Sequence, residues 1–173
     1  MSTPVLWLPD TIRNEGGYVY SDRHGDPGGP TKGGISSLWL SRKLGHPVTP
    51  AEISALSTSQ IDAYYTQDFW NPLYNQIGNQ AVANKLADCG VNCGPGTAVA
   101  IMQQCLVDMG ATLTVDGAIG PATIAAINAA DSRELLLRFC YRQCLRYMQI
   151  RPLDDGNLRE WVVRVQYAYP KGA

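Results

Sequence analysis

Apolar positions recur every three or four residues along most of the chain, and this spacing is typical of amphipathic helices. The first such run predicts a helix in which Val5, Leu8, Ile12 and Glu15 share one face, with a distortion at Pro9. The sequence therefore predicts a mainly α fold.

Capping residues and breakers divide the rest of the chain into further helices. "TPAE" at 49–52 and "STSQ" at 57–60 have the spacing of capping boxes, "GPG" at 94–96 ends a helix, and Pro121 begins another. The predicted later helices are one from 50, then 58–70, 82–93, 98–109, one from 121, 132–151 and 157–169. We expect two lobes, 1–80 and 81–173, packed as one compact unit.

One stretch, Arg13–Ser36, departs from the helical pattern because it is rich in Gly, Asp and Pro. Such a stretch offers few side chains to bury, and glycine loses much backbone entropy on ordering, so packing alone does not explain it. Its "GYVYS" and "TKGGIS" segments predict a short Gly-rich β-hairpin after the first helix, with "DPGG" as a turn.

Glu15 stands at the junction of the first helix and this hairpin. It continues an apolar helix face and is followed at once by Gly16 and Gly17, which are typical of a helix end. Apolar neighbours and the negative end of the helix dipole both disfavour a carboxylate, so we expect Glu15 to keep its proton longer than in water. A general acid needs this property, although a local partner such as Arg13 or Lys32 would also explain the residue.

The hairpin would bring a second acid and a hydroxyl beside Glu15. Asp22 or Asp26, together with Thr31, would be equipped to orient a water molecule at an anomeric carbon. The order of residues in "GGPTKGG" does not match that of a phosphate-binding loop, because Lys32 precedes Gly33.

Composition narrows the classes of partner. A net charge of −1 and a pI of about 6.1 provide no general attraction for nucleic acid or anionic lipid. The charge is uneven, because residues 131–173 are rich in Lys and Arg, and Arg138, Arg142 and Arg146 form one stripe on a helix. We interpret this stripe as a solvated face or a docking surface for the acidic half of the chain.

The apolar runs predict no membrane insertion and no signal peptide, so we expect synthesis in the cytoplasm. The pairs Cys89 and Cys93, and Cys140 and Cys144, are each four residues apart on apolar stripes. Buried free thiols explain this better than a metal site, and we expect no metal or other cofactor.

The motifs resemble a known family. "EGGYV" with "DPGGPTKGGIS" is similar to the signature of the glycoside hydrolase family 108 muramidases of phage endolysins and secretion-linked lysozyme-like proteins. "FWNPL", "LADCGVNCGPGTAVAIMQQCL" and "TVDGAIGPATIAAI" resemble the predicted peptidoglycan-binding segment that follows in that family, so nearly the whole chain is covered.

The resemblance implies a lysozyme-like fold and cleavage of the β-1,4 bond after N-acetylmuramic acid, with Glu15 as proton donor. The hairpin is slightly longer here than in the family pattern, so either Asp26 or Asp22 can take the water-side position with Thr31. Tyr18 and Trp70 are the aromatic candidates for stacking on sugars.

Three functions remain open from the sequence. The first is a peptidoglycan hydrolase that acts on glycan strands in the periplasm after release through a holin pore or an export route. The second is a lytic transglycosylase, in which the substrate's own hydroxyl replaces water and only Glu15 is needed. The third is a cell-wall-binding or secretion-accessory module without catalysis.

Overall fold

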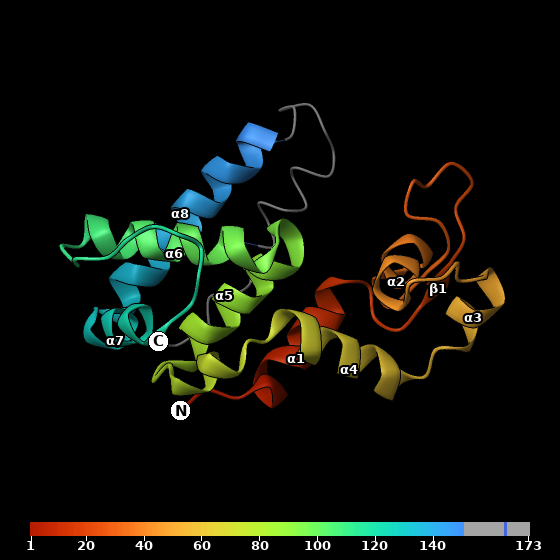
Figure 1. The fold of residues 1–173 in the computed structure, drawn as a ribbon, viewed down its shortest axis with the longest axis horizontal. Coiled ribbons are helices and arrows are strands. Elements are labelled where there is room, and N and C mark those ends of the chain that lie inside the picture. The colour runs from red at the N-terminus through yellow and green to blue at the C-terminus, as the bar shows by residue number, and fades with distance from the viewer. Residues whose placement is uncertain (151–164, 166–173) are drawn as a thin grey trace. The chain divides into compact units, whose positions relative to one another are not determined.

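The computed structural model describes residues 1–150 and Val165, and its described part is mainly helical with one small sheet (Figure 1). The elements in chain order are α1 (Pro4–Asn14), β1 (Tyr20–Ser21), β2 (Thr31–Lys32), β3 (Ile35–Ser36), α2 (Ser37–Leu44), α3 (Pro50–Ala55), α4 (Thr58–Phe69), the 3-10 helix η1 (Pro72–Gln76), α5 (Gln80–Cys93), α6 (Pro95–Asp108), α7 (Pro121–Ala129) and α8 (Ser132–Ile150). The predicted fold class, with a Gly-rich hairpin directly after the first helix, is confirmed.

The chain divides into two compact units, one formed by residues 7–68 and the other by residues 1–6 with 69–173. This division does not decide which residues perform which function. The assignment of a catalytic lobe to 1–80 and a peptidoglycan-binding lobe to 81–173 therefore stays a prediction.

The unit of residues 7–68 is built around a three-stranded antiparallel sheet in the order β1-β2-β3. Thr31 pairs with Ser21 on one side and with Ser36 on the other, so β2 is the central strand. Gly33 and Gly34 alone connect β2 to β3, and both have positive φ angles, of 55° and 78°. Two successive positive φ angles match the twist of the hairpin strands, and glycine adopts them without steric cost.

Helix caps in this unit follow the sequence signals. The Thr49 side chain accepts a hydrogen bond from the Glu52 N–H, and the Glu52 carboxylate accepts one from the Thr49 N–H, which completes the predicted capping box of α3. Ser57 and Gln60 exchange the same pair of bonds at the start of α4. The local sequence was therefore sufficient to locate these helix starts.

The face of α1 that is buried differs from the predicted one. Trp7, Thr11 and Ile12 are buried, whereas Val5 is 72% exposed, so the prediction that Val5 belongs to the buried stripe is wrong. The predicted face and the buried face of α1 both contain Ile12, and helical periodicity alone cannot choose between them. Burial of the large Trp7 indole removes more apolar surface from water than burial of a valine would.

The second unit contains α5, α6, α7 and α8, which pack against one another. Figure 1 shows α8 lying beside α6, with α5 next to both. Val82, Leu86, Met102, Leu106 and Phe139 are almost completely buried where these helices meet. The predicted helix 157–169 lies outside the described residues, except that Val165 is helical and buried.

A buried glutamine fixes the loop between α6 and α7. The Gln103 side-chain amide donates to the Asp116 carboxylate, and its oxygen accepts from the N–H groups of Asp116 and Gly117. The bond from Gln103 lowers the pKa of Asp116, because it stabilises the charged form. The "TVDG" turn seen in the sequence is therefore fastened to α6 by one side chain.

The described helices include none that combines the length and the apolar character needed to cross a bilayer.

Candidate active site

Glu15 occupies the C-cap of α1, and the chain beyond it closes the helix with two backbone bonds. The Gly17 N–H donates to the Ile12 carbonyl at 2.8 Å, and the Gly16 N–H donates to the Arg13 carbonyl at 3.1 Å. This pair of bonds is a Schellman motif, which needs the positive φ angle of 87° at Gly16, and Gly17 also has a positive φ angle, of 74°. The glycines therefore fix the backbone from which the half-buried Glu15 side chain projects.

The Gly33-Gly34 turn lies against this side chain. A Cβ atom placed on Gly34 would lie 3.2 Å from Glu15 Oε2 and 3.3 Å from Glu15 Cβ, and it would overlap the Tyr65 hydroxyl oxygen. The absence of a side chain at Gly34 thus leaves room for the carboxyl group. This close approach explains one of the glycines that the sequence left without a packing role.

Helix α4 supports the turn from the other side. Tyr65 is 2% exposed, and its hydroxyl donates to the Gly33 carbonyl at 3.1 Å. One turn earlier in α4, Ile61 is fully buried. A Cβ atom placed on Gly33 would lie only 3.1 Å from the methyl carbons of Ile61. The hairpin turn is therefore held between Glu15 and α4. Sequence reasoning missed this bond, although the four-residue spacing of Ile61 and Tyr65 marks one helix face.

Tyr18 lies at the surface directly after the α1 cap. It is 37% exposed, and its hydroxyl donates to Asp62 Oδ1 at 2.6 Å. This bond to Asp62 raises the pKa of Tyr18 to about 12, because it stabilises the neutral phenol and places a negative charge beside it. The phenol ring is held in one position next to the Glu15 cap, and part of it is open to solvent.

Asp26 lies in the turn between β1 and β2 and is exposed. Its Oδ1 accepts a hydrogen bond from the Gly28 N–H at 2.8 Å, and its carbonyl accepts one from the Gly29 N–H at 3.0 Å. This is the Asx-type turn that "DPGG" predicts. The backbone bonds thus fix the orientation of the Asp26 carboxylate.

Asp22 is also exposed and directly follows β1, and the hydrogen bonds among the described residues include none to its carboxylate. Thr31 is half-buried in β2, and its hydroxyl donates to the Gly29 carbonyl at 3.0 Å. Thr31 and Asp26 therefore bond to neighbouring residues of a single turn. Lys32 takes no part in the site, because its Nζ donates to the Ser54 and Leu56 carbonyls at the end of α3.

Trp70 is not available for sugar stacking. Its side chain is 4% exposed, its indole N–H donates to Asn75 Oδ1 at 2.8 Å, and its ring contacts Tyr74 edge to face. A sugar needs an open aromatic face, so this prediction is wrong and Trp70 belongs to the core. The sequence could not reveal this, because an aromatic residue beside a proline turn can face either way.

The cysteines are free thiols in the described structure. Cys89 and Cys93 have their sulfur atoms 3.3 Å apart on α5, while Cys140 and Cys144 pack against the buried Tyr147 and Val165. The residues that the structure describes contain no group of three or more His, Cys, Asp or Glu side chains suited to a metal ion.

The chain resembles known proteins in both sequence and fold. The family model described as glycosyl hydrolase 108 matches residues 8–94, and the model described as Predicted Peptidoglycan domain matches residues 97–165. The comparison with curated proteins gives no significant match. Among solved structures, SagA from Brucella abortus is similar at 25% sequence identity and a TM-score of 0.78, covering 95% of this chain and 90% of that one.

A glycosyl hydrolase model followed by a peptidoglycan domain supports a peptidoglycan hydrolase. The Glu15 cap, the Asp26 turn and the Gly33-Gly34 hairpin all fall within the residues matched by the first model. The chain therefore belongs to the glycosyl hydrolase 108 family.

Proposed function

We propose that this protein is an N-acetylmuramidase that hydrolyses the β-1,4 bond between N-acetylmuramic acid and N-acetylglucosamine, with Glu15 as general acid. The observation that carries the proposal is the placement of the Glu15 carboxyl group at a rigid helix cap, against a side-chain-free turn. A catalytic group must be held within a few tenths of an ångström of its working position, and this arrangement supplies that constraint.

The reaction needs a proton for the leaving oxygen and a water molecule for the anomeric carbon. Glu15 donates the proton, and a carboxylate of the β1–β2 turn with Thr31 orients the water. Asp26 suits this role better than Asp22, because a backbone N–H already holds its carboxylate in one direction. The Thr31 hydroxyl donates to Gly29, which leaves its oxygen lone pairs able to accept a bond from water.

The decisive experiment pairs a Glu15→Gln variant with analysis of the products of digested peptidoglycan. The amide has the same shape but cannot donate the proton, so the rate should fall at least about 100-fold. Glu134→Gln is the matched control, because Glu134 is exposed on α8 and forms only a surface pair with Arg138. A Glu15→Gln variant as active as this control would remove Glu15 from the mechanism.

Mass spectrometry of the products separates hydrolysis from the transglycosylase reaction. Reducing muramic acid ends require water as the acceptor, whereas anhydro ends require the substrate's own hydroxyl. Comparing Asp26→Asn with Asp22→Asn then tests the water-side group. We expect the larger loss for Asp26→Asn, and unchanged rates in both variants would exclude a carboxylate of this turn from the reaction.

A further inference from the structure

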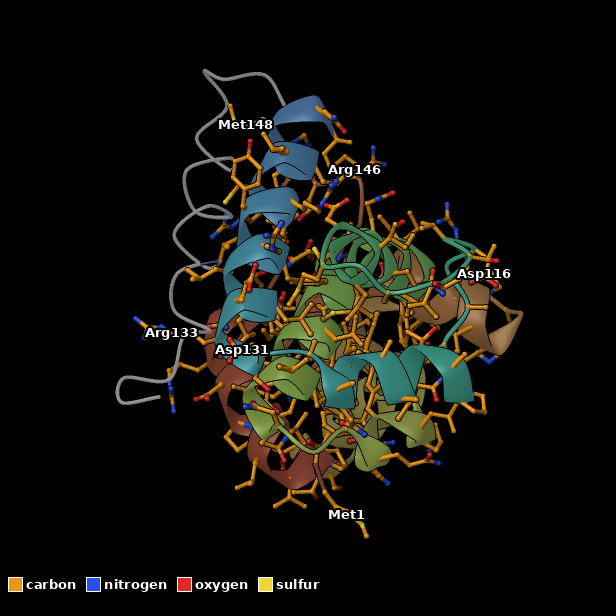
Figure 2. The ribbon with its side chains drawn as sticks, turned by 90° about the vertical axis from the view of Figure 1, so that its left-hand side faces the viewer. Met1, Asp116, Asp131, Arg133, Arg146 and Met148 are labelled. Carbon is orange, nitrogen blue, oxygen red and sulfur yellow. The ribbon has the colours of Figure 1, made fainter. Side chains whose placement is uncertain are left out.

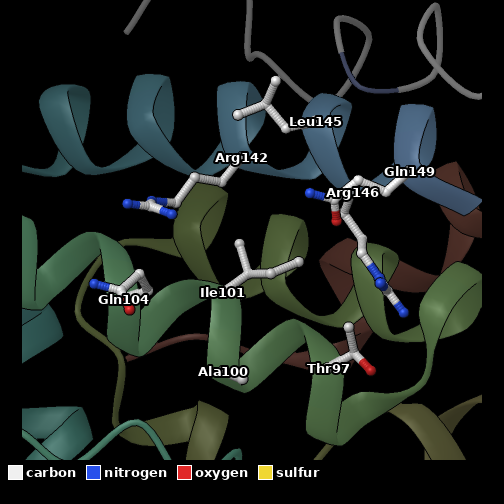
Figure 3. Close-up of a pocket in the computed structure, with 8 residues that line it drawn as sticks. All are labelled: Thr97, Ala100, Ile101, Gln104, Arg142, Leu145, Arg146 and Gln149. Atoms are coloured by element: carbon white, nitrogen blue, oxygen red, sulfur yellow. The ribbon is translucent and has the colours of Figure 1, made fainter.

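A separate pocket of about 340 Å³ lies between α6 and α8, in the unit that does not contain Glu15 (Figure 3). Its lining is Thr97, Ala100, Ile101, Gln104, Arg142, Leu145, Arg146 and Gln149. The volume is at the lower end of the range for small-molecule sites, so it suits a short segment of a ligand rather than a long strand.

One end of the pocket is balanced in charge. The Arg142 guanidinium bonds to Asp108 Oδ2, and the Gln104 side-chain amide donates to Asp108 Oδ1 at 3.0 Å. These bonds lower the pKa of Asp108, the Arg142 bond most strongly. The three side chains therefore form a fixed network, and the positive charge of Arg142 is largely neutralised.

The other end carries a positive charge without such compensation. Arg146 is exposed, and the described part of the chain places no carboxylate within salt-bridge distance of it. In Figure 3 its guanidinium reaches across the pocket toward Thr97, while Ile101 lies between the two arginines. The pocket thus combines an apolar floor with a guanidinium, two amides and a hydroxyl, which together suit a carboxylate next to a short apolar group.

We propose that this pocket binds the carboxylate-bearing peptide stems of peptidoglycan, with Arg146 holding a stem carboxylate. The inference rests on the proposed function for its substrate class. One observation supports peptidoglycan as the ligand, and a second favours its peptide over its glycan. All eight lining residues fall within the segment matched by the peptidoglycan model, residues 97–165. The charge of the pocket complements the peptide, because the stems carry several carboxylates. N-acetylglucosamine carries none, and the lactyl carboxyl group of N-acetylmuramic acid is consumed in the amide bond to the stem.

The test measures binding by isothermal titration calorimetry in a Glu15→Gln background, so that the ligand is not cleaved. The probe is a soluble disaccharide–tetrapeptide. The comparison is the same disaccharide with its lactyl carboxyl group capped as a simple amide, because removing the peptide alone would leave a free carboxylate. We expect the peptide-bearing probe to bind more tightly, with affinity falling as salt is raised. Arg146→Gln should weaken its binding about tenfold, the effect of losing one charge-assisted hydrogen bond, and Arg146→Lys should restore part of the affinity.

Arg133→Gln is the matched control, because it removes the same charge from the same helix. Figure 2 shows that Arg133 and Arg146 lie toward opposite ends of α8, and Arg133 does not line the pocket. Equal affinity for both probes, or equal losses in the two Gln variants, would overturn the proposal.

Cleavage assays with the enzyme that retains Glu15 distinguish a failure of this proposal from a failure of the proposed function. The wild-type enzyme and the Arg133→Gln control should cleave peptide-free glycan chains at the same rate. Cleavage of glycan without peptide-dependent binding refutes only the stem-binding pocket. Peptide-dependent binding without any cleavage refutes only the muramidase assignment.

Discussion

Replacing Gly34 with alanine adds one methyl group at a point bordered by the Glu15 carboxyl group and the Tyr65 hydroxyl. Two costs follow. The φ angle of 78° disfavours any L side chain by roughly 1–2 kcal/mol. The methyl group must also displace the buried Tyr65 hydroxyl from Gly33, which costs about 1 kcal/mol for the hydrogen bond and about 1 kcal/mol for overpacking.

We therefore expect Gly34→Ala to lower the free energy of unfolding by about 3 kcal/mol. Gly45 provides a matched control, because its φ angle is 77° and a Cβ placed there meets nothing within 4 Å. Gly45→Ala should cost only the backbone term, about 1 kcal/mol. The difference of about 2 kcal/mol between the two variants measures the crowding at the site, by urea denaturation followed by circular dichroism.

The double variant Gly34→Ala/Tyr65→Phe sharpens the test, because phenylalanine lacks the oxygen that the methyl group would overlap. The double variant should be less destabilising than the sum of the single variants by about 2 kcal/mol, because the hydrogen bond is lost only once and the overpacking is relieved. Turnover of cell-wall suspensions should fall at least about tenfold in Gly34→Ala and stay near wild type in Gly45→Ala, since displacing Glu15 misplaces the acid. Equal stability losses at Gly34 and Gly45, or additive effects with Tyr65→Phe, would refute this account of the turn.

Three further predictions concern other contacts. Ultraviolet titration should find Tyr18 ionising at about pH 12, and Asp62→Asn should move this toward the ordinary tyrosine value; an unchanged titration would contradict the Tyr18–Asp62 bond. Thr49→Ala removes the capping box of α3 and should cost about 1 kcal/mol in thermal or urea unfolding, with no loss of activity per folded molecule. Gln103→Leu removes the bonds from this buried side chain to the part-buried N–H groups of Asp116 and Gly117 and should cost about 1–2 kcal/mol. Gln103 lowers the pKa of Asp116, so this bond contributes to stability above the ordinary Asp pKa, and the contribution is lost as pH falls through the lowered pKa. The free energy of unfolding, measured across acid pH, should therefore vary less in Gln103→Leu than in the wild type.

The sequence predicted the helices well because their starts and ends are local chemistry. Thr49 and Glu52 form their capping box from residues three positions apart, and Gly16 and Gly17 close α1 through bonds to its own last turn. The hairpin was predictable for the same reason, since paired glycines and "DPGG" specify turns regardless of what surrounds them. The sequence also identified Glu15, because an acid directly before such a cap is an unusual combination.

Tertiary packing decided between alternatives that the local sequence patterns could not distinguish. Tyr18 and Trp70 were both candidates for sugar contact, and only the fold exposes the first and buries the second. The support of Gly33 by Tyr65 joins positions 32 residues apart, and the Asp108–Arg142 bond joins positions 34 apart. Periodicity reports which face of an element is apolar, but not which partner covers that face. The sequence by itself thus determined the elements and the place of Glu15 at the end of α1, whereas the turn that receives Glu15 and the pocket around Arg146 exist only because distant segments pack together.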